Sequence, residues 1–87
     1  MVYELSESAQ RVLRVLASRA MDGYTLRSRT KLTPDNLTSA LEELVNRSLV
    51  VVKGELVPDS VGEAYLTVTR EAKGYLQYVL LQKQVLF

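Results

Sequence analysis

Apolar residues recur every three or four positions in the first part of the chain, and this spacing is typical of a helix with one buried face. The expected helix covers residues 6–21, with Ser6 as its N-cap. Asp22-Gly23 is predicted to end it, because glycine can adopt the left-handed conformation of a helix C-cap. Its buried stripe consists of Ala9, Val12, Leu13, Leu16 and Ala20.

The next segment, residues 25–31, is short and polar, and it predicts a second helix. Thr25 could cap this helix, and Leu26 is its clearest core residue. Its helical signal is the weakest of the chain, because serine and threonine compete with the backbone for hydrogen bonds inside a helix. Leu32 then lies in a turn and is expected to reach the core.

Residues 33–47 predict a third helix more strongly. Thr33 is a suitable N-cap and Pro34 takes the first helical position, where its missing N–H costs nothing. At 100° per residue the apolar and polar positions separate into two faces. The buried face contains Leu37, Ala40, Leu41 and Leu44, and the opposite ridge contains Asp35, Ser39, Glu42 and Asn46.

Two strands and a last helix are expected in the remaining part of the chain. β-Branched residues predict a strand at 49–53, and alternation of apolar residues with threonine predicts another at 64–69. Turn residues between them predict a two-stranded antiparallel hairpin with its tip at about 54–63. A final helix is expected over residues 70–86.

This final helix carries two apolar stripes, which is too much apolar surface for a helix that faces solvent on one side. One stripe can pack against its own domain. The other stripe is formed by Tyr78, Leu81 and Val85. We expect it to bind a second copy of the chain, which predicts a homodimer.

Composition narrows the function. A chain of 87 residues predicts one domain, here residues 1–87. The absence of cysteine excludes a cysteine nucleophile and a thiolate metal site, and the absence of histidine removes the commonest general base. We therefore expect no enzyme, no metal site and no cofactor. No stretch approaches the roughly 20 apolar residues of a membrane span, and no signal peptide is visible, so a cytoplasmic protein is expected.

Charge is unevenly distributed although the net charge is only +1. Residues 23–53 hold five cations against three carboxylates. Residues 54–69, which include the expected hairpin tip, hold three carboxylates and no cation. A weak positive balance near the second and third helices is therefore followed by an acidic segment.

The order helix, short helix, helix, strand, loop, strand, helix resembles that of winged helix-turn-helix regulators, such as the MarR, PadR and ArsR families. The stretch that carries the resemblance has Gly23, a threonine-capped helix, Leu32 in the turn, a Thr33 cap, and a closing Leu49-Val50 strand. The segment LTVTREAKGYL (66–76) resembles the strand and helix start that follow the wing. The resemblance implies an α+β fold with a three-helix core, a two-stranded wing and a C-terminal helix.

The resemblance also implies a function, namely regulation of transcription by a homodimer bound to double-stranded DNA with the third helix in the major groove. Basic residues of the second helix would contact phosphates, and the start of the third helix would reach base edges. The implied DNA-binding residues are Arg27, Arg29, Lys31, Thr33, Asn36, Thr38 and Ser39.

Two positions depart from the family pattern. Ser48 stands before the first strand, where these families usually have glycine, and the wing lacks the usual basic residue near its tip. The acidic wing, together with Asp35 and Glu42, supports a second hypothesis, a winged-helix module that binds a basic protein partner and no DNA. The two hypotheses differ in whether the cations of residues 27–31 are exposed or are neutralised by wing carboxylates.

Overall fold

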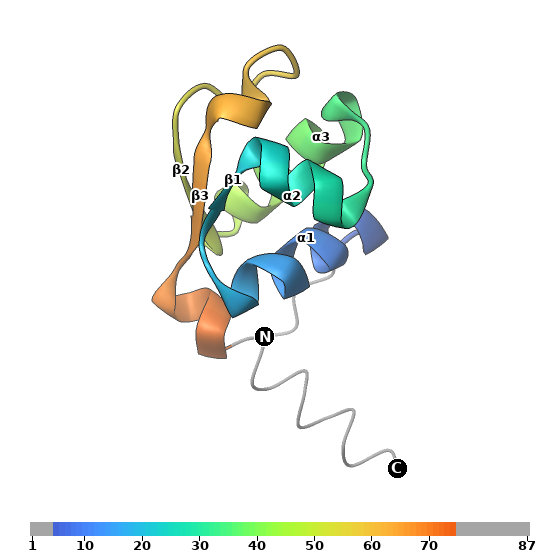
Figure 1. Cartoon of the computed structure of the whole chain (residues 1–87). Helices are drawn as coiled ribbons and strands as arrows, with labels where there is room; N and C mark the ends of the chain where they lie inside the picture. The colour runs from blue at the N-terminus through green and yellow to red at the C-terminus, as the bar shows by residue number, and fades with distance from the viewer. Residues whose placement is uncertain (1–4, 75–87) are drawn as a thin grey trace.

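The computed structural model describes residues 5–74. The elements are, in chain order, α1 (Glu7–Ser18), β1 (Met21–Asp22), α2 (Gly23–Thr30), α3 (Pro34–Asn46), β2 (Val50–Lys53), the 3-10 turn η1 (Val61–Glu63) and β3 (Tyr65–Val68). Residues 70–74 begin a further helix. Figure 1 shows the strands on one side of the molecule and the three labelled helices packed beside them. The expected α+β class is confirmed.

A single apolar core joins these elements. Every helix and strand contributes to it, because each carries an apolar face that must be covered by another element. Its largest fully buried side chains are Leu13, Leu16, Leu26, Leu37, Leu41, Leu44, Leu49, Leu66, Val12 and Val61. The predicted stripe of α3 is buried as expected, and Leu32 packs against the edge of the core from its turn.

The first helix begins where the sequence predicts but ends earlier. The Ser6 hydroxyl accepts a hydrogen bond from the Ala9 N–H at 3.2 Å, as an N-cap does. The helix stops at Ser18 rather than at residue 21, and Arg19 is extended with φ of −174°. The extended chain then brings the buried Met21 side chain opposite Leu66.

The expected two-stranded sheet is therefore a three-stranded antiparallel sheet in the order β1-β3-β2. Strand β1 is only two residues long, and its pairing partner lies more than 40 positions away. A pattern of two residues has no periodicity, so the sequence could not predict this strand. The β2–β3 hairpin itself is present, with Val50 opposite Val68 and Lys53 opposite Tyr65.

The second helix also begins earlier than predicted. Asp22, rather than Thr25, is its N-cap, and the Asp22 carboxylate accepts a hydrogen bond from the Thr25 N–H at 2.9 Å. Aspartate is among the strongest N-cap residues, so it prevails over a threonine three positions later. The prediction of Gly23 as a left-handed C-cap of α1 is wrong, because Gly23 is the first residue of α2.

Stability should depend on the ionisation of Asp22. Hydrogen bonds from the side chain and then the backbone of Thr25 hold the pKa of Asp22 below its ordinary value of 3.8. The ionised carboxylate thus stabilises the folded state, and this contribution is present above the unfolded-state pKa and lost as the pH falls through the folded-state pKa.

We expect the Asp22→Asn variant to keep the cap but to lose this pH dependence, since asparagine caps a helix about as well as aspartate. Urea unfolding of both proteins at about pH 6 and about pH 3 measures the effect. The wild type should lose more stability than the variant between these two conditions. An equal loss in both proteins would show that other carboxyl groups dominate the acid range.

The third helix agrees with the sequence almost residue for residue. The Thr33 hydroxyl accepts a hydrogen bond from the Asn36 N–H at 3.2 Å, and Pro34 is the first helical residue. Ser48, just after α3, has a φ of +60°. This is the left-handed conformation that glycine adopts most easily, which is consistent with the glycine expected here from the resemblance to winged helix-turn-helix families.

The end of the described chain is tied to the end of α3. The Thr69 hydroxyl donates to the Ser48 carbonyl at 2.7 Å and accepts from the Ala72 N–H at 3.2 Å. Thr69 is thus positioned as the N-cap of the helix that begins at residue 70. The rest of the expected helix, including the proposed dimer residues Tyr78, Leu81 and Val85, lies outside the described residues.

Candidate nucleic-acid interface

The second helix presents its basic residues to solvent. Only Gly23, Leu26 and Thr30 of α2 are buried, so its other residues form an outward surface. Arg27, Arg29 and Lys31 are all exposed. Among residues 5–74, none of the three forms an ion pair with a carboxylate. Their charges are therefore available to an external anion.

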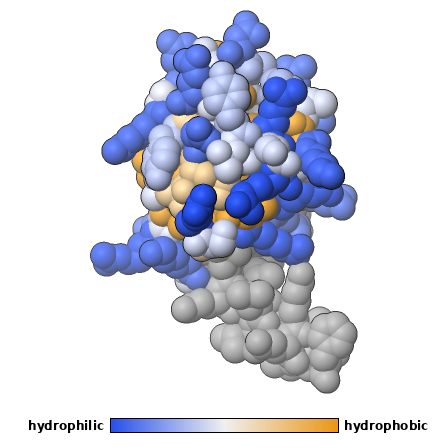
Figure 2. Space-filling view, in the orientation of Figure 1, coloured by the Kyte–Doolittle hydropathy of each residue, from blue (hydrophilic) through white to orange (hydrophobic). Residues whose placement is uncertain are grey.

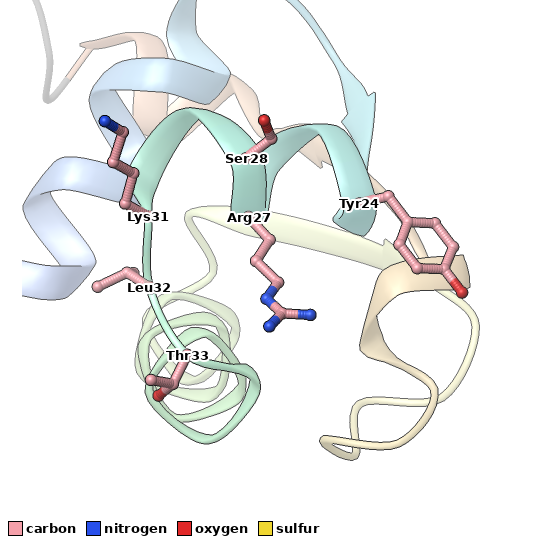
Figure 3. A pocket seen from close by; sticks show the side chains of 6 residues that line it. All are labelled: Tyr24, Arg27, Ser28, Lys31, Leu32 and Thr33. Atoms are coloured by element: carbon pink, nitrogen blue, oxygen red, sulfur yellow. The ribbon is translucent and has the colours of Figure 1, made fainter.

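These cations do not all face the same way. A shallow groove of about 470 Å³ lies beside α2 and the turn that leads to α3. It is lined by Tyr24, Arg27, Ser28, Lys31, Leu32 and Thr33. Figure 3 shows Arg27 extending into the space between the start of α3 and the wing, whereas Lys31 extends in the other direction, toward α1. Arg29 lies on a neighbouring hollow with Thr25 and Ser28.

The conformation of Lys31 follows from the end of α2. Lys31 has a φ of +60°, and its N–H donates to the Arg27 carbonyl at 2.7 Å. This left-handed C-cap reverses the chain direction and leads it into α3. A lysine at a helix C-terminus is also favoured by the helix dipole, so the position has a structural role as well as a potential binding role.

The third helix exposes a polar ridge beside this groove. Asn36 and Ser39 are exposed, as are Asp35, Glu42 and Asn46. Their side chains are of the kind that forms hydrogen bonds with base edges. The ridge is therefore placed as the sequence predicts, although it contains no cation.

Thr38 and Thr33 differ from the sequence-based expectation. Thr38 is only 5% exposed, and its hydroxyl donates to the Pro34 carbonyl at 2.8 Å. It is therefore a buried helix residue and not part of the exposed surface, since position 38 lies between the ridge and the core. Thr33 is exposed, but its hydroxyl already caps α3 by accepting from Asn36.

Tyr24 belongs to the same surface, and the sequence analysis did not select it. Its side chain is 60% exposed, and one face of the ring lies against the backbone of Gly62 in η1. A Cβ at Gly62 would lie 2.6 Å from the Tyr24 ring, so the ring can hold this position only while residue 62 is glycine. An aromatic residue two positions after the helix N-cap was the available signal, but its contact with the wing is non-local.

The wing is acidic on its exposed surface. Glu55, Asp59 and Glu63 are all exposed, and none of them neutralises a cation of α2 within residues 5–74. Figure 2 shows mostly hydrophilic side chains over the visible face and a smaller apolar area low in the view. In the described part of the chain, no group of three potential metal ligands is present, and no helix is long and apolar enough to cross a membrane.

Helices α2 and α3 joined by a three-residue turn, followed by a β-hairpin, define the winged helix-turn-helix fold. Two crystallised proteins share it. The adhesin competence repressor AdcR from Streptococcus pyogenes matches with a TM-score of 0.70 and 15% identity, over 95% of this chain and 61% of that chain. ZitR from Lactococcus lactis, as the C30AH42A mutant, matches with a TM-score of 0.74 and 17% identity, over 97% of this chain and 57% of that chain.

These matches confirm the fold that the sequence resemblance implied. The chain spans about three fifths of the length of both proteins. No family model matches the chain, and no curated protein matches it either.

Proposed function

We propose that this chain is a DNA-binding transcription regulator that acts as a homodimer. Helix α3 would enter the major groove, with Asn36 and Ser39 facing base edges. Arg27, Arg29 and Lys31 would contact phosphates on either side of the groove. The fold supports this proposal, and AdcR, which shares it, is a repressor.

The observation that carries the proposal is the exposure of the α2 cations beside the open ridge of α3. The alternative, a module for a basic protein partner, would have gained support if the wing carboxylates neutralised these cations. Glu55, Asp59 and Glu63 form no ion pair with them within residues 5–74. The α2 cations are therefore not paired with the wing carboxylates in the described part of the chain, and they lie on the first helix of the helix-turn-helix.

The proposed dimer rests on the apolar stripe of Tyr78, Leu81 and Val85 in the expected last helix. A two-fold axis would place two copies of α3 in successive major grooves, about 34 Å apart. The target would then be an inverted repeat with half-sites about one helical turn apart. Light scattering of a chain truncated after residue 76 tests the interface, since a truncated protein that remains dimeric would exclude it.

Binding to a random-sequence duplex tests the proposal directly. Fluorescence anisotropy should show salt-dependent binding with a shallow slope of log K against log salt, about −3 for one subunit and about −5 for the dimer if each α2 cation contacts one phosphate. The Arg27→Glu, Lys31→Glu variant should bind at least about tenfold more weakly, because two phosphate contacts become repulsive.

The matched control is the Arg14→Glu, Arg19→Glu variant. Both double reversals change the net charge from +1 to −3, but Arg14 and Arg19 are exposed on and just after α1, away from the α2–α3 groove. The control should keep most of the affinity. An equal loss in both variants would indicate a non-specific charge effect, and absence of binding at low salt would favour the protein-partner alternative.

A further inference from the structure

Two adjacent glutamates on α3 have different environments. Glu43 is half-buried, and its carboxylate accepts a hydrogen bond from the Ser6 N–H at 2.7 Å, which ties α3 to the start of α1. Glu42 is exposed, and within residues 5–74 it has no hydrogen bond or ion pair. The structure therefore accounts for Glu43 by an internal contact, whereas Glu42 has no internal role.

The position of Glu42 is unusual for a helix that faces DNA. It lies on the exposed ridge of α3 between Ser39 and Asn46. Residues 34–46 contain no lysine or arginine, and Arg47, which follows, is half-buried and engaged within the protein. No neighbouring cation on α3 can offset the repulsion between this carboxylate and a polyanion. The carboxylate can be accommodated in the groove only by a hydrogen-bond donor.

The major groove offers few donors. Cytosine presents its N4 amino group and adenine its N6 amino group, whereas guanine N7 and O6 and thymine O4 are acceptors. Across an A·T pair the amino group is flanked by acceptors on both sides, N7 of adenine and O4 of thymine. Across a G·C pair the cytosine amino group has an acceptor on one side only, O6 of guanine. A carboxylate is therefore repelled least at cytosine.

We infer that Glu42 is a specificity-determining residue that selects cytosine at one position of each half-site by accepting a hydrogen bond from its N4 amino group. The inference rests on the proposed function and deepens it by naming a base preference. Ser39 precedes Glu42 by three residues, about 4.5 Å along the helix axis. This distance is close to one base-pair step, so Ser39 faces the neighbouring base pair. The same carboxylate lowers the affinity for sequences that place guanine or thymine opposite it.

Selection of bound duplexes from a randomised library tests the inference with four proteins. The wild type should enrich cytosine at one position per half-site. Glu42→Gln should move the preference at that position to adenine, because a carboxamide pairs with N6 and N7 together. Glu42→Ala should lose the preference. In affinity measurements on individual duplexes, replacing the cytosine should weaken binding of the wild type about tenfold or more. The same replacement should barely change the affinity of Glu42→Ala.

Asp59→Asn is the matched control, since it also removes one exposed carboxylate, but from the wing. It should raise affinity slightly for every sequence and leave the preference unchanged. A selected motif that is identical in the wild type and in Glu42→Ala would overturn the inference while leaving DNA binding intact. A wild-type protein that retains no duplex from the library would overturn the proposed function itself, and the base preference with it.

Discussion

The Gly23→Ala variant is expected to lose a large part of its stability. A Cβ at this position would lie 1.8 Å from the Val61 carbonyl oxygen and 2.8 Å from the Gly62 Cα. Both neighbours are backbone atoms, which cannot move aside like a flexible side chain. The Gly23 N–H also donates to the Ala64 carbonyl at 2.9 Å, so α2 cannot retreat without losing this bond.

The expected cost is about 3 kcal/mol or more, at the upper end of what overpacking causes. A domain of this size has a total stability of about 4–13 kcal/mol, so the substitution should remove about a quarter to three quarters of it. Urea unfolding followed by circular dichroism measures the loss.

The matched control for this substitution is Gly74→Ala. A Cβ at Gly74 meets nothing within 4 Å, and residue 74 is helical. Alanine should therefore stabilise this helix by up to about 1 kcal/mol relative to glycine. If Gly23→Ala were as stable as Gly74→Ala, the close contact between α2 and η1 would not exist in solution.

The Leu26→Ala variant should show the second large effect. Leu26 is the one large apolar residue of α2 that is buried, and it is fully buried. Its truncation removes buried methyl groups and leaves a cavity, at a typical cost of about 3 kcal/mol. The other buried residues of α2, Gly23 and Thr30, are small. We therefore expect the protein to lose stability and α2 to lose its fixed position.

Two measurements on Leu26→Ala separate stability from binding. Urea unfolding should show the loss of free energy of unfolding. DNA affinity should fall even where the variant remains folded, because the helix proposed to contact phosphates is no longer held in place. Ser28→Ala, an exposed change on the same helix, should leave both quantities nearly unchanged. Normal DNA affinity of folded Leu26→Ala protein would argue against a role of α2 in positioning the phosphate contacts.

Local signals in the sequence were sufficient for α3. The Thr33-Pro34 start, the apolar spacing and the polar ridge all depend on residues within a few positions of each other, so the helix and its faces could be predicted. The exposure of Arg27, Arg29 and Lys31 could also be predicted from the sequence, because charged side chains stay in water unless they are paired.

The environment of individual site residues was harder to predict. Thr38 was expected at the surface, but it is buried at the edge of the core with its hydroxyl donating to the Pro34 carbonyl. Tyr24 was not selected, because its packing partner Gly62 lies on the wing, 38 positions later. Glu42 and Glu43 are identical in type, and only their neighbours in space distinguish them.

The sequence by itself determined the order of the elements, the face of each helix that is buried and the separation of a basic α2 from an acidic wing. These features follow from short-range periodicity, capping residues and charge, which act over one or two helical turns. Only the tertiary structure decided that residues 21–22 form a third strand, that Asp22 caps α2 and that Gly23 must be glycine. The strand and the glycine requirement depend on contacts with β3, Ala64 or η1, some 40 positions away. The Asp22 cap is a local contact with Thr25, which the sequence offered beside the competing Thr25 cap.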